Sequence, residues 1–168
     1  MHTVNKTINN VIDALADFLQ PFCGQSEIIR AQTNRTPIPS GEFVVLTEIL
    51  QVELETPITI WDETTQEQTF LSPTRIDVQI DFYGPNAGDY CKAATGVLRT
   101  EHACSQFPAG IKPLYASDGV QSPLVTGEQQ WLTRWTITAS LQYNPNIVVP
   151  SQTAVALAYN FNKASDIK

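Results

Sequence analysis

The clearest pattern in the chain is a strict alternation of apolar and polar residues over positions 74–83. A period of two, built from β-branched and aromatic residues, predicts a strand with one buried face and one solvent-exposed face. Positions 131–143 alternate in the same way and predict a second strand of this kind. Trp131, Trp135 and Tyr143 fall on its apolar face, so we interpret them as core residues rather than as a platform for a ligand.

Two other segments place apolar residues three and four positions apart, which is the spacing of an amphipathic helix. The first predicts a helix over about 3–19 that is capped by Thr3 and stopped by Pro21. The second follows Asn86, a favourable N-cap, and runs to about Glu101. Each helix offers an apolar stripe that can cover a half-buried sheet. We therefore predict an α+β fold, with a mostly antiparallel mixed sheet and two helices packed on one face.

Residues 53–72 have the pattern of a long β-hairpin with a polar tip, which carries Trp61, Asp62, Glu63 and Glu67. A hairpin of this length with so few apolar residues at its tip is difficult to place inside a small domain, so we expect it to project and contact a neighbour. The run before it, residues 43–50, is apolar almost throughout and predicts a strand buried on both faces.

Residues 26–42 combine a short strand-like run with a turn-rich loop. This segment carries Arg30 and Arg35 in a chain that has only 10 basic residues. Arginine favours bidentate pairing with carboxylates, so one interpretation is a clamp on a neighbouring subunit. The alternative is a pair of solvated arginines, since surface charge pairs contribute little.

The length of 168 residues fits a single domain, 1–168. Its parts are an N-terminal helix over about 3–19, a sheet with the second helix over 43–143, a C-terminal strand segment over about 147–161 and a loose tail over 162–168. In the C-terminal segment Val155, Leu157, Tyr159 and Phe161 alternate with alanines and Asn160. This alternation favours a strand, although alanine also suits a helix.

The composition narrows the class of function. Hydrophobic residues make up 42% of the chain, which is enough for a core, while the net charge of −7 argues against a protein that grips nucleic acid phosphates. No apolar stretch reaches membrane-spanning length, and the opening residues lack the apolar run of a secretory signal. The three cysteines are odd in number and irregularly spaced, so we expect reduced thiols in a cytosolic setting.

A search for chemistry in the sequence is mostly negative. His102 and Cys104 lack the second ligand pair of a zinc site, and Cys91 falls on the sheet-facing side of the predicted helix, where a thiol is structural. Asp77 and Asp81 share the polar face of a strand, where we expect them to be solvated. We therefore predict no catalytic residues, no cofactor and no metal, and a protein that is not an enzyme.

The order of these patterns resembles a known family. A helix is followed by a proline-rich loop with Asn34-Arg35-Thr36-Pro37, then by the strand Arg75-Ile-Asp-Val-Gln-Ile-Asp-Phe-Tyr-Gly, a short helix, and a strand beginning Trp131-Leu-Thr-Arg-Trp. Tyr143-Asn-Pro and a final segment containing Pro150 close the order. Over about residues 5–161 the chain resembles the neck or tail-terminator proteins of tailed bacteriophages.

The resemblance implies a tail-terminator-like fold and a homo-oligomeric ring of about six subunits. It implies a virion protein, assembled in the host cytoplasm, that docks to the tail tube on one side and to head-completion proteins on the other, with DNA passing through the lumen. A closed ring needs two different complementary patches on each subunit. We assign Arg30 and Arg35 to one patch, and Trp61, Asp62, Glu63 and Glu67 to the other.

Two further interpretations stay open. The chain is alternatively another head- or tail-completion component, which would share size and architecture with a terminator. It is alternatively a monomeric module for a peptide or small ligand, which a strictly monomeric state and a deep apolar pocket would favour.

Overall fold

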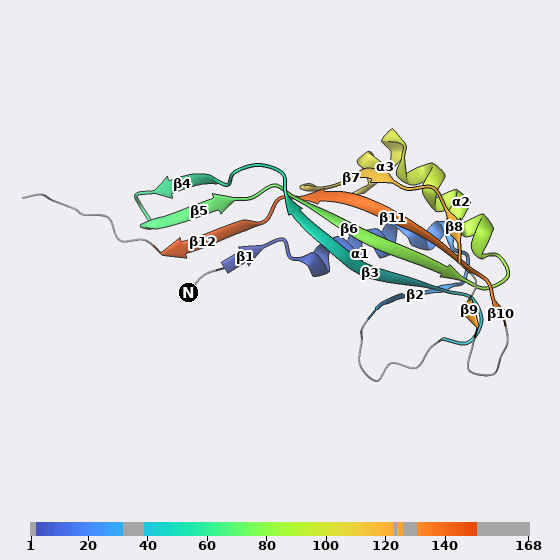
Figure 1. Cartoon of the computed structure of the whole chain (residues 1–168). Helices are drawn as coiled ribbons and strands as arrows, with labels where there is room; N and C mark the ends of the chain where they lie inside the picture. The colour runs from blue at the N-terminus through green and yellow to red at the C-terminus, as the bar shows by residue number, and fades with distance from the viewer. Residues whose placement is uncertain (1–2, 32–38, 123, 126–130, 151–168) are drawn as a thin grey trace, which may run out of the picture.

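The main sheet has six strands and is antiparallel except at one edge. In the computed structural model, which describes residues 3–31, 39–122, 124–125 and 131–150, the strand order is β2-β3-β6-β11-β7, with β8 pairing β11 (Figure 1). The only parallel pair among these strands is β2 with β3. The strands of the main sheet are β2 (Glu27–Arg30), β3 (Phe43–Glu53), β6 (Thr74–Tyr83), β7 (Ile111–Ala116), β8 (Val120–Gln121) and β11 (Arg134–Tyr143).

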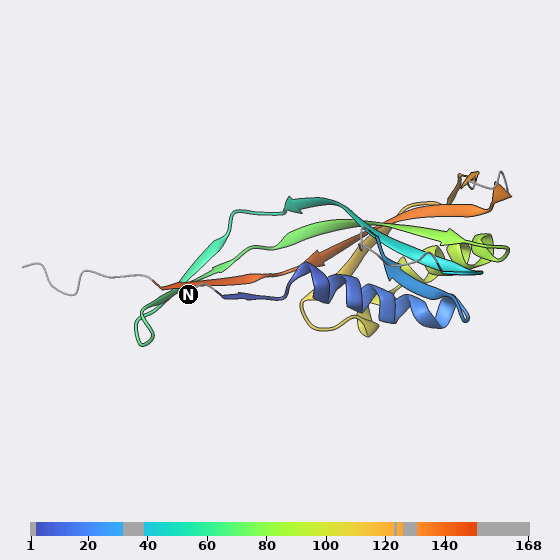
Figure 2. The same cartoon turned by 90° about the horizontal axis from the view of Figure 1, so that it is seen from below.

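The helices lie on one face of the main sheet, as Figure 2 shows. They are α1 (Ile8–Leu19), the short 3-10 helix η1 (Gln20–Phe22), α2 (Ala87–Leu98) and α3 (Glu101–Gln106). Leu15 and Leu19 of α1 are fully buried and belong to the same core cluster as Ile80 and Phe82 of β6. The predicted α+β fold, with helices covering one face of a mostly antiparallel sheet, is therefore confirmed.

The two alternating strands are confirmed as the centre of the sheet. β6 and β11 pair over their whole length, from Thr74 with Tyr143 to Tyr83 with Arg134. Tyr143 is buried and Trp135 packs against the core, as predicted. The prediction was wrong for Trp131, which is 75% exposed. It lies in a separate short strand, β10 (Trp131–Leu132), which pairs with β9 (Leu124–Val125) away from the main sheet.

The first helix starts later than predicted. Residues 3–5 form a strand, β1 (Thr3–Asn5), which pairs with β12 (Asn146–Pro150), so they are drawn away from the helix. Lys6 has a φ of 61° and lies in the bend between β1 and α1. Thr7, and not Thr3, caps α1, with its backbone N–H donating to Asn10 Oδ1 at 2.8 Å.

The second helix ends earlier than predicted. α2 stops at Leu98, and the N–H and hydroxyl of Thr100 both donate to the Val97 carbonyl, at 3.0 and 2.7 Å, before α3 begins. Asn86 stands at the predicted N-cap position but its side chain makes no cap hydrogen bond. Glu42 instead accepts from the Asn86 N–H at 2.8 Å and from the Tyr90 hydroxyl at 3.0 Å.

A second sheet projects from one end of the main sheet (Figures 1 and 2). It has four strands in the order β1-β12-β5-β4, where β4 is Ile58–Asp62 and β5 is Glu67–Leu71. We call these four strands the arm. The predicted hairpin over 53–72 is thus present as β4 and β5. β12 is the described part of the predicted C-terminal strand segment, and residues 151–168, like Arg35, lie outside the described residues.

Candidate assembly surface

The arm is a sheet that carries apolar side chains on both faces. Cα partners across a sheet point to the same side, so the registers of β4, β5 and β12 define the two faces. Ile58, Ile60, Leu71 and Val148 share one face, and Trp61, Phe70, Ile147 and Val149 share the other. Every residue of these three strands is exposed or only partly buried.

Among the described residues, no layer covers either face of the arm. The helices all lie over the main sheet, and Figure 1 shows the arm extending beyond them. Small sheets gain stability by burying a hydrophobic face, and contiguous exposed apolar surface marks a contact site. The outer edge of β4 has no partner strand among the described residues and carries Ile58 and Ile60, which are 53% and 50% exposed. The arm has the features of a surface that a partner covers.

The tip of the arm brings together the four hairpin residues singled out in the sequence. Asp62 and Glu67 are register partners at the end of β4 and β5, Trp61 precedes Asp62 on the opposite face, and Glu63 is in the turn. Backbone N–H groups of Thr64 and Thr65 donate to Asp62 Oδ1, at 2.8 and 3.4 Å, and lower the pKa of that carboxyl. The tip is therefore an acidic surface at neutral pH.

Arg30 lies far from the tip, at the end of β2 in the main sheet (Figure 1). Its guanidinium forms an ion pair with Glu48 and donates to Asn9 Oδ1 on α1. The residue thus has partners within its own chain, while its side chain is still 39% exposed. A role for Arg30 and Arg35 in subunit contacts stays a prediction.

The second half of β3 is a free edge. β2 pairs with β3 only from Phe43 to Leu46, and no described strand pairs with residues 47–53 on that side. A β-bulge between Glu48 and Leu50 shifts the alternation, so that Leu50 and Val52 pair with Asp77 and Arg75 on the face away from the helices. Leu50 is 48% exposed, so the expected burial of this run on both faces was wrong for its second half.

The polar face of β6 is a hydrogen-bonded network and not a set of solvated carboxylates. Asp81 is only 4% exposed. Its Oδ1 accepts from Arg134 Nη2 at 2.9 Å and from the Thr136 hydroxyl at 2.6 Å, and Gln79 donates to its Oδ2 at 2.8 Å. The prediction of a solvated Asp81 was therefore wrong. The network ties β6 to β11 and holds the sheet from which the arm projects.

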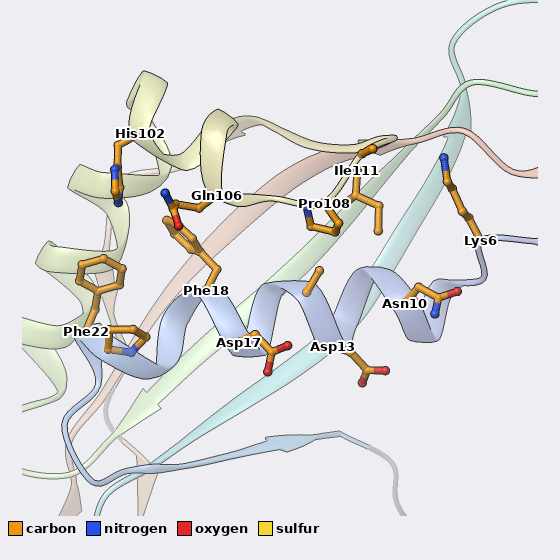
Figure 3. A pocket seen from close by; sticks show the side chains of 13 residues that line it. Lys6, Asn10, Asp13, Asp17, Phe18, Phe22, His102, Gln106, Pro108 and Ile111 are labelled. Carbon is orange, nitrogen blue, oxygen red and sulfur yellow. The ribbon is translucent and has the colours of Figure 1, made fainter.

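A groove of about 730 Å³ runs between α1 and the segment that leads from α3 into β7 (Figure 3). Phe18 and Phe22 lie within it, Asp13 and Asp17 line its α1 side, and His102 comes from α3. Its lining mixes single charges with apolar surface, and these side chains do not form a nucleophile with an adjacent base.

The cysteines are not arranged for chemistry. Burial raises the pKa of the Cys23 thiol to about 11 and also raises the pKa of Cys91, so neither is an activated thiolate. Cys104 is exposed, and its Sγ lies 3.9 Å from the Pro113 carbonyl oxygen. Over the part of the chain that the structure describes, no three His, Cys, Asp or Glu side chains are placed to hold a metal ion.

The sequence and the structure both match known proteins. A family model described as "Phage neck terminator protein" matches residues 9–163. Among solved structures, the sheath/tube terminator of an extracellular contractile injection system (PVC, extended state) matches with a TM-score of 0.51 and 12% identity over 98% of this chain. This chain spans 66% of the length of that protein, and the likeness shows a shared fold.

A chain from the virion of a native gene transfer agent also matches, with 9% identity over 83% of this chain and 94% of that one, but its TM-score of 0.36 is too low to support an argument. No curated protein sequence matches significantly. Among the described residues, none of the helices has the length and apolar character to span a membrane.

Proposed function

Because this chain belongs to the family of phage neck terminator proteins, a structural and not an enzymatic class, we propose that it forms a homo-oligomeric ring at the head–tail junction of a tailed phage. The ring has about six subunits, terminates the tail tube and joins it to the head or neck. Its partners are further copies of itself, the tail tube protein and head-completion proteins. The ring assembles in the host cytoplasm, becomes part of the virion and has no membrane partner.

The observation that carries this proposal is the arm. It carries apolar side chains on both faces, with Ile58 and Ile60 about half exposed at the free edge of β4, and it extends away from the helices that cover the main sheet. A monomer would leave this surface in water, whereas a neighbouring subunit in a ring would cover it. The arm therefore serves as one of the two complementary patches that a closed ring requires.

The charges of the chain support the same arrangement. The acidic tip, with Asp62, Glu63 and Glu67, is one candidate patch, and the segment that contains Arg30 and Arg35 is the other. Charge reversal with Arg35→Glu is expected to weaken ring formation, and ring formation at the wild-type concentration would count against this pairing. The net charge of −7 also suits a lumen through which DNA moves without binding.

The experiment that tests the function adds the purified protein to purified tail tubes and images the tubes by electron microscopy. A terminator adds density at one end of each tube and stops further polymerisation of tube protein. Binding to head-completion proteins without binding to tube ends would instead identify a neighbouring completion component. Binding to neither would overturn the proposal.

A further inference from the structure

The free edge of β3 is the strongest unexplained feature of the main sheet. β3 runs to Glu53, but β2 ends opposite Leu46, so residues 47–53 offer backbone groups on one side that no described strand uses. Leu50 and Val52 are 48% and 37% exposed there, and Ile49 at the bulge is half exposed as well. An apolar edge of this kind attracts a further strand, and native proteins normally cover such edges.

The sequence contains a segment that fits this edge. After Pro150 the chain continues as residues 151–168, in which Val155, Leu157, Tyr159 and Phe161 occupy every second position. This is the period of a strand with one apolar face, and alanines occupy most of the positions between. We propose that residues 151–168 of one subunit add as a strand to the free β3 edge of its neighbour. This inference rests on the proposed ring.

The direction of β12 favours a neighbour over the same chain. β12 starts beside the end of the main sheet and runs outward along the arm, where Pro150 pairs with Glu67 at the tip (Figure 1). The chain therefore leaves the arm at the end that points away from the main sheet. Residues 151–159 contain no Gly, Asn or Asp, the residues that tolerate the left-handed backbone of a tight reversal. Continuation in the same direction carries the segment to another molecule.

The length of the segment is sufficient. β12 ends at Pro150 and the chain has 168 residues, so 18 residues follow it. These residues reach roughly 60 Å when extended. The edge over residues 47–53 spans roughly 23 Å. Strand addition supplies main-chain hydrogen bonds along the edge, and the alternating side chains then pack on Leu50 and Val52.

The edge lies next to one of the two charge patches. Arg30 is the register partner of Leu46, the last β3 residue that β2 covers, so the free edge begins beside Arg30. On the other side, residues 151–168 leave the arm beside Asp62 and Glu67. If the acidic tip of one subunit contacts the Arg30 region of its neighbour, residues 151–168 of the first subunit begin next to the start of the neighbour's free β3 edge.

The test is a disulfide scan in the full-length chain, with the exposed native thiol removed by Cys104→Ser. One tagged chain carries Val52→Cys on the β3 edge, and a second, untagged chain carries Val155→Cys, Leu157→Cys or Tyr159→Cys in turn. The two chains are mixed as monomers, assembled and oxidised. The matched controls replace Val52→Cys with Leu114→Cys or with Tyr115→Cys on β7, two positions that are 48% and 55% exposed.

Assembly that holds two thiols together gives an effective concentration in the millimolar range, so at least one scan position is expected to cross-link to the Val52→Cys chain roughly tenfold more than to either control. Equal cross-linking to the Leu114→Cys or Tyr115→Cys chain, or equal yields at all three scan positions, would each overturn the inference. Rings that form without the Val52→Cys cross-link would overturn it while leaving the proposed function intact. A wild-type chain that neither forms rings nor binds tube ends would overturn the proposed function itself.

Discussion

The apolar edge of the arm makes a quantitative prediction about assembly. Ile58 and Ile60 lie on the outer strand of the arm and are about half exposed, at 53% and 50%. Full burial of an isoleucine side chain contributes roughly 2–3 kcal/mol, so covering the exposed half of each contributes about 1 kcal/mol. The double variant Ile58→Thr with Ile60→Thr is therefore expected to lose about 2 kcal/mol per subunit contact, which is roughly a 30-fold weaker association.

Threonine is the replacement of choice because it keeps the β-branched shape that suits a strand. The assay is sedimentation velocity over a concentration series, with urea unfolding of the monomer as a separate measure of folding. The matched control is Leu114→Thr with Val120→Thr, which replaces two exposed apolar residues on β7 and β8. The reasoning is refuted if the arm variant assembles at the wild-type concentration, or if the control weakens assembly equally.

Three further predictions concern the stability of the subunit. Asp81→Ala leaves Arg134 without its buried partner and is expected to cost about 3 kcal/mol in urea unfolding, whereas Asp118→Ala at an exposed ion pair costs less than about 1 kcal/mol. Equal losses would contradict the importance of burial. Burial raises the pKa of Cys23 in the folded chain to about 11, above its ordinary value of 9.0. The contribution of this thiol to the free energy of unfolding is therefore fully present below pH 9 and is lost as the pH rises towards 11. Cys23→Ala is expected to flatten that fall, and an unchanged pH profile would disprove the assignment. Gly84→Ala is expected to destabilise the folded subunit, because Gly84 has a φ of 116° and a Cβ there would lie 2.7 Å from Glu42 Cγ. Gly96→Ala, in open space within α2, is expected to stabilise the subunit by up to about 1 kcal/mol. Thermal unfolding distinguishes the two, and the opposite order would contradict the steric requirement for glycine at position 84.

Much of the fold was predictable from local periodicity. β6 and β11 each present one apolar and one polar face over ten residues, so their place at the centre of a half-covered sheet follows from the sequence. The short segments were less predictable. Residues 3–5 have the composition of a helix start, and only their pairing with β12, more than 140 positions later in the chain, makes them a strand. Long-range pairing of this kind leaves no local pattern.

The candidate surface was predictable in part. The polar composition of the hairpin tip indicated that Trp61, Asp62, Glu63 and Glu67 would lie together, and they do. The free edge of β3 was missed, because an apolar run looks the same whether its own chain or a partner covers it. The burial of Asp81 was missed as well, because its main partner, Arg134, is 53 positions away. The periodicity shows which side chains are apolar, but the tertiary structure determines what covers them.

The most direct test of the central claim is the mass of the wild-type protein in solution, measured by light scattering over a concentration series and followed by negative-stain imaging of the large species. The account predicts a ring of about six subunits with a central hole, formed by the protein alone or on the ends of added tail tubes. A chain that stays monomeric at high concentration and also ignores the tube ends would contradict it.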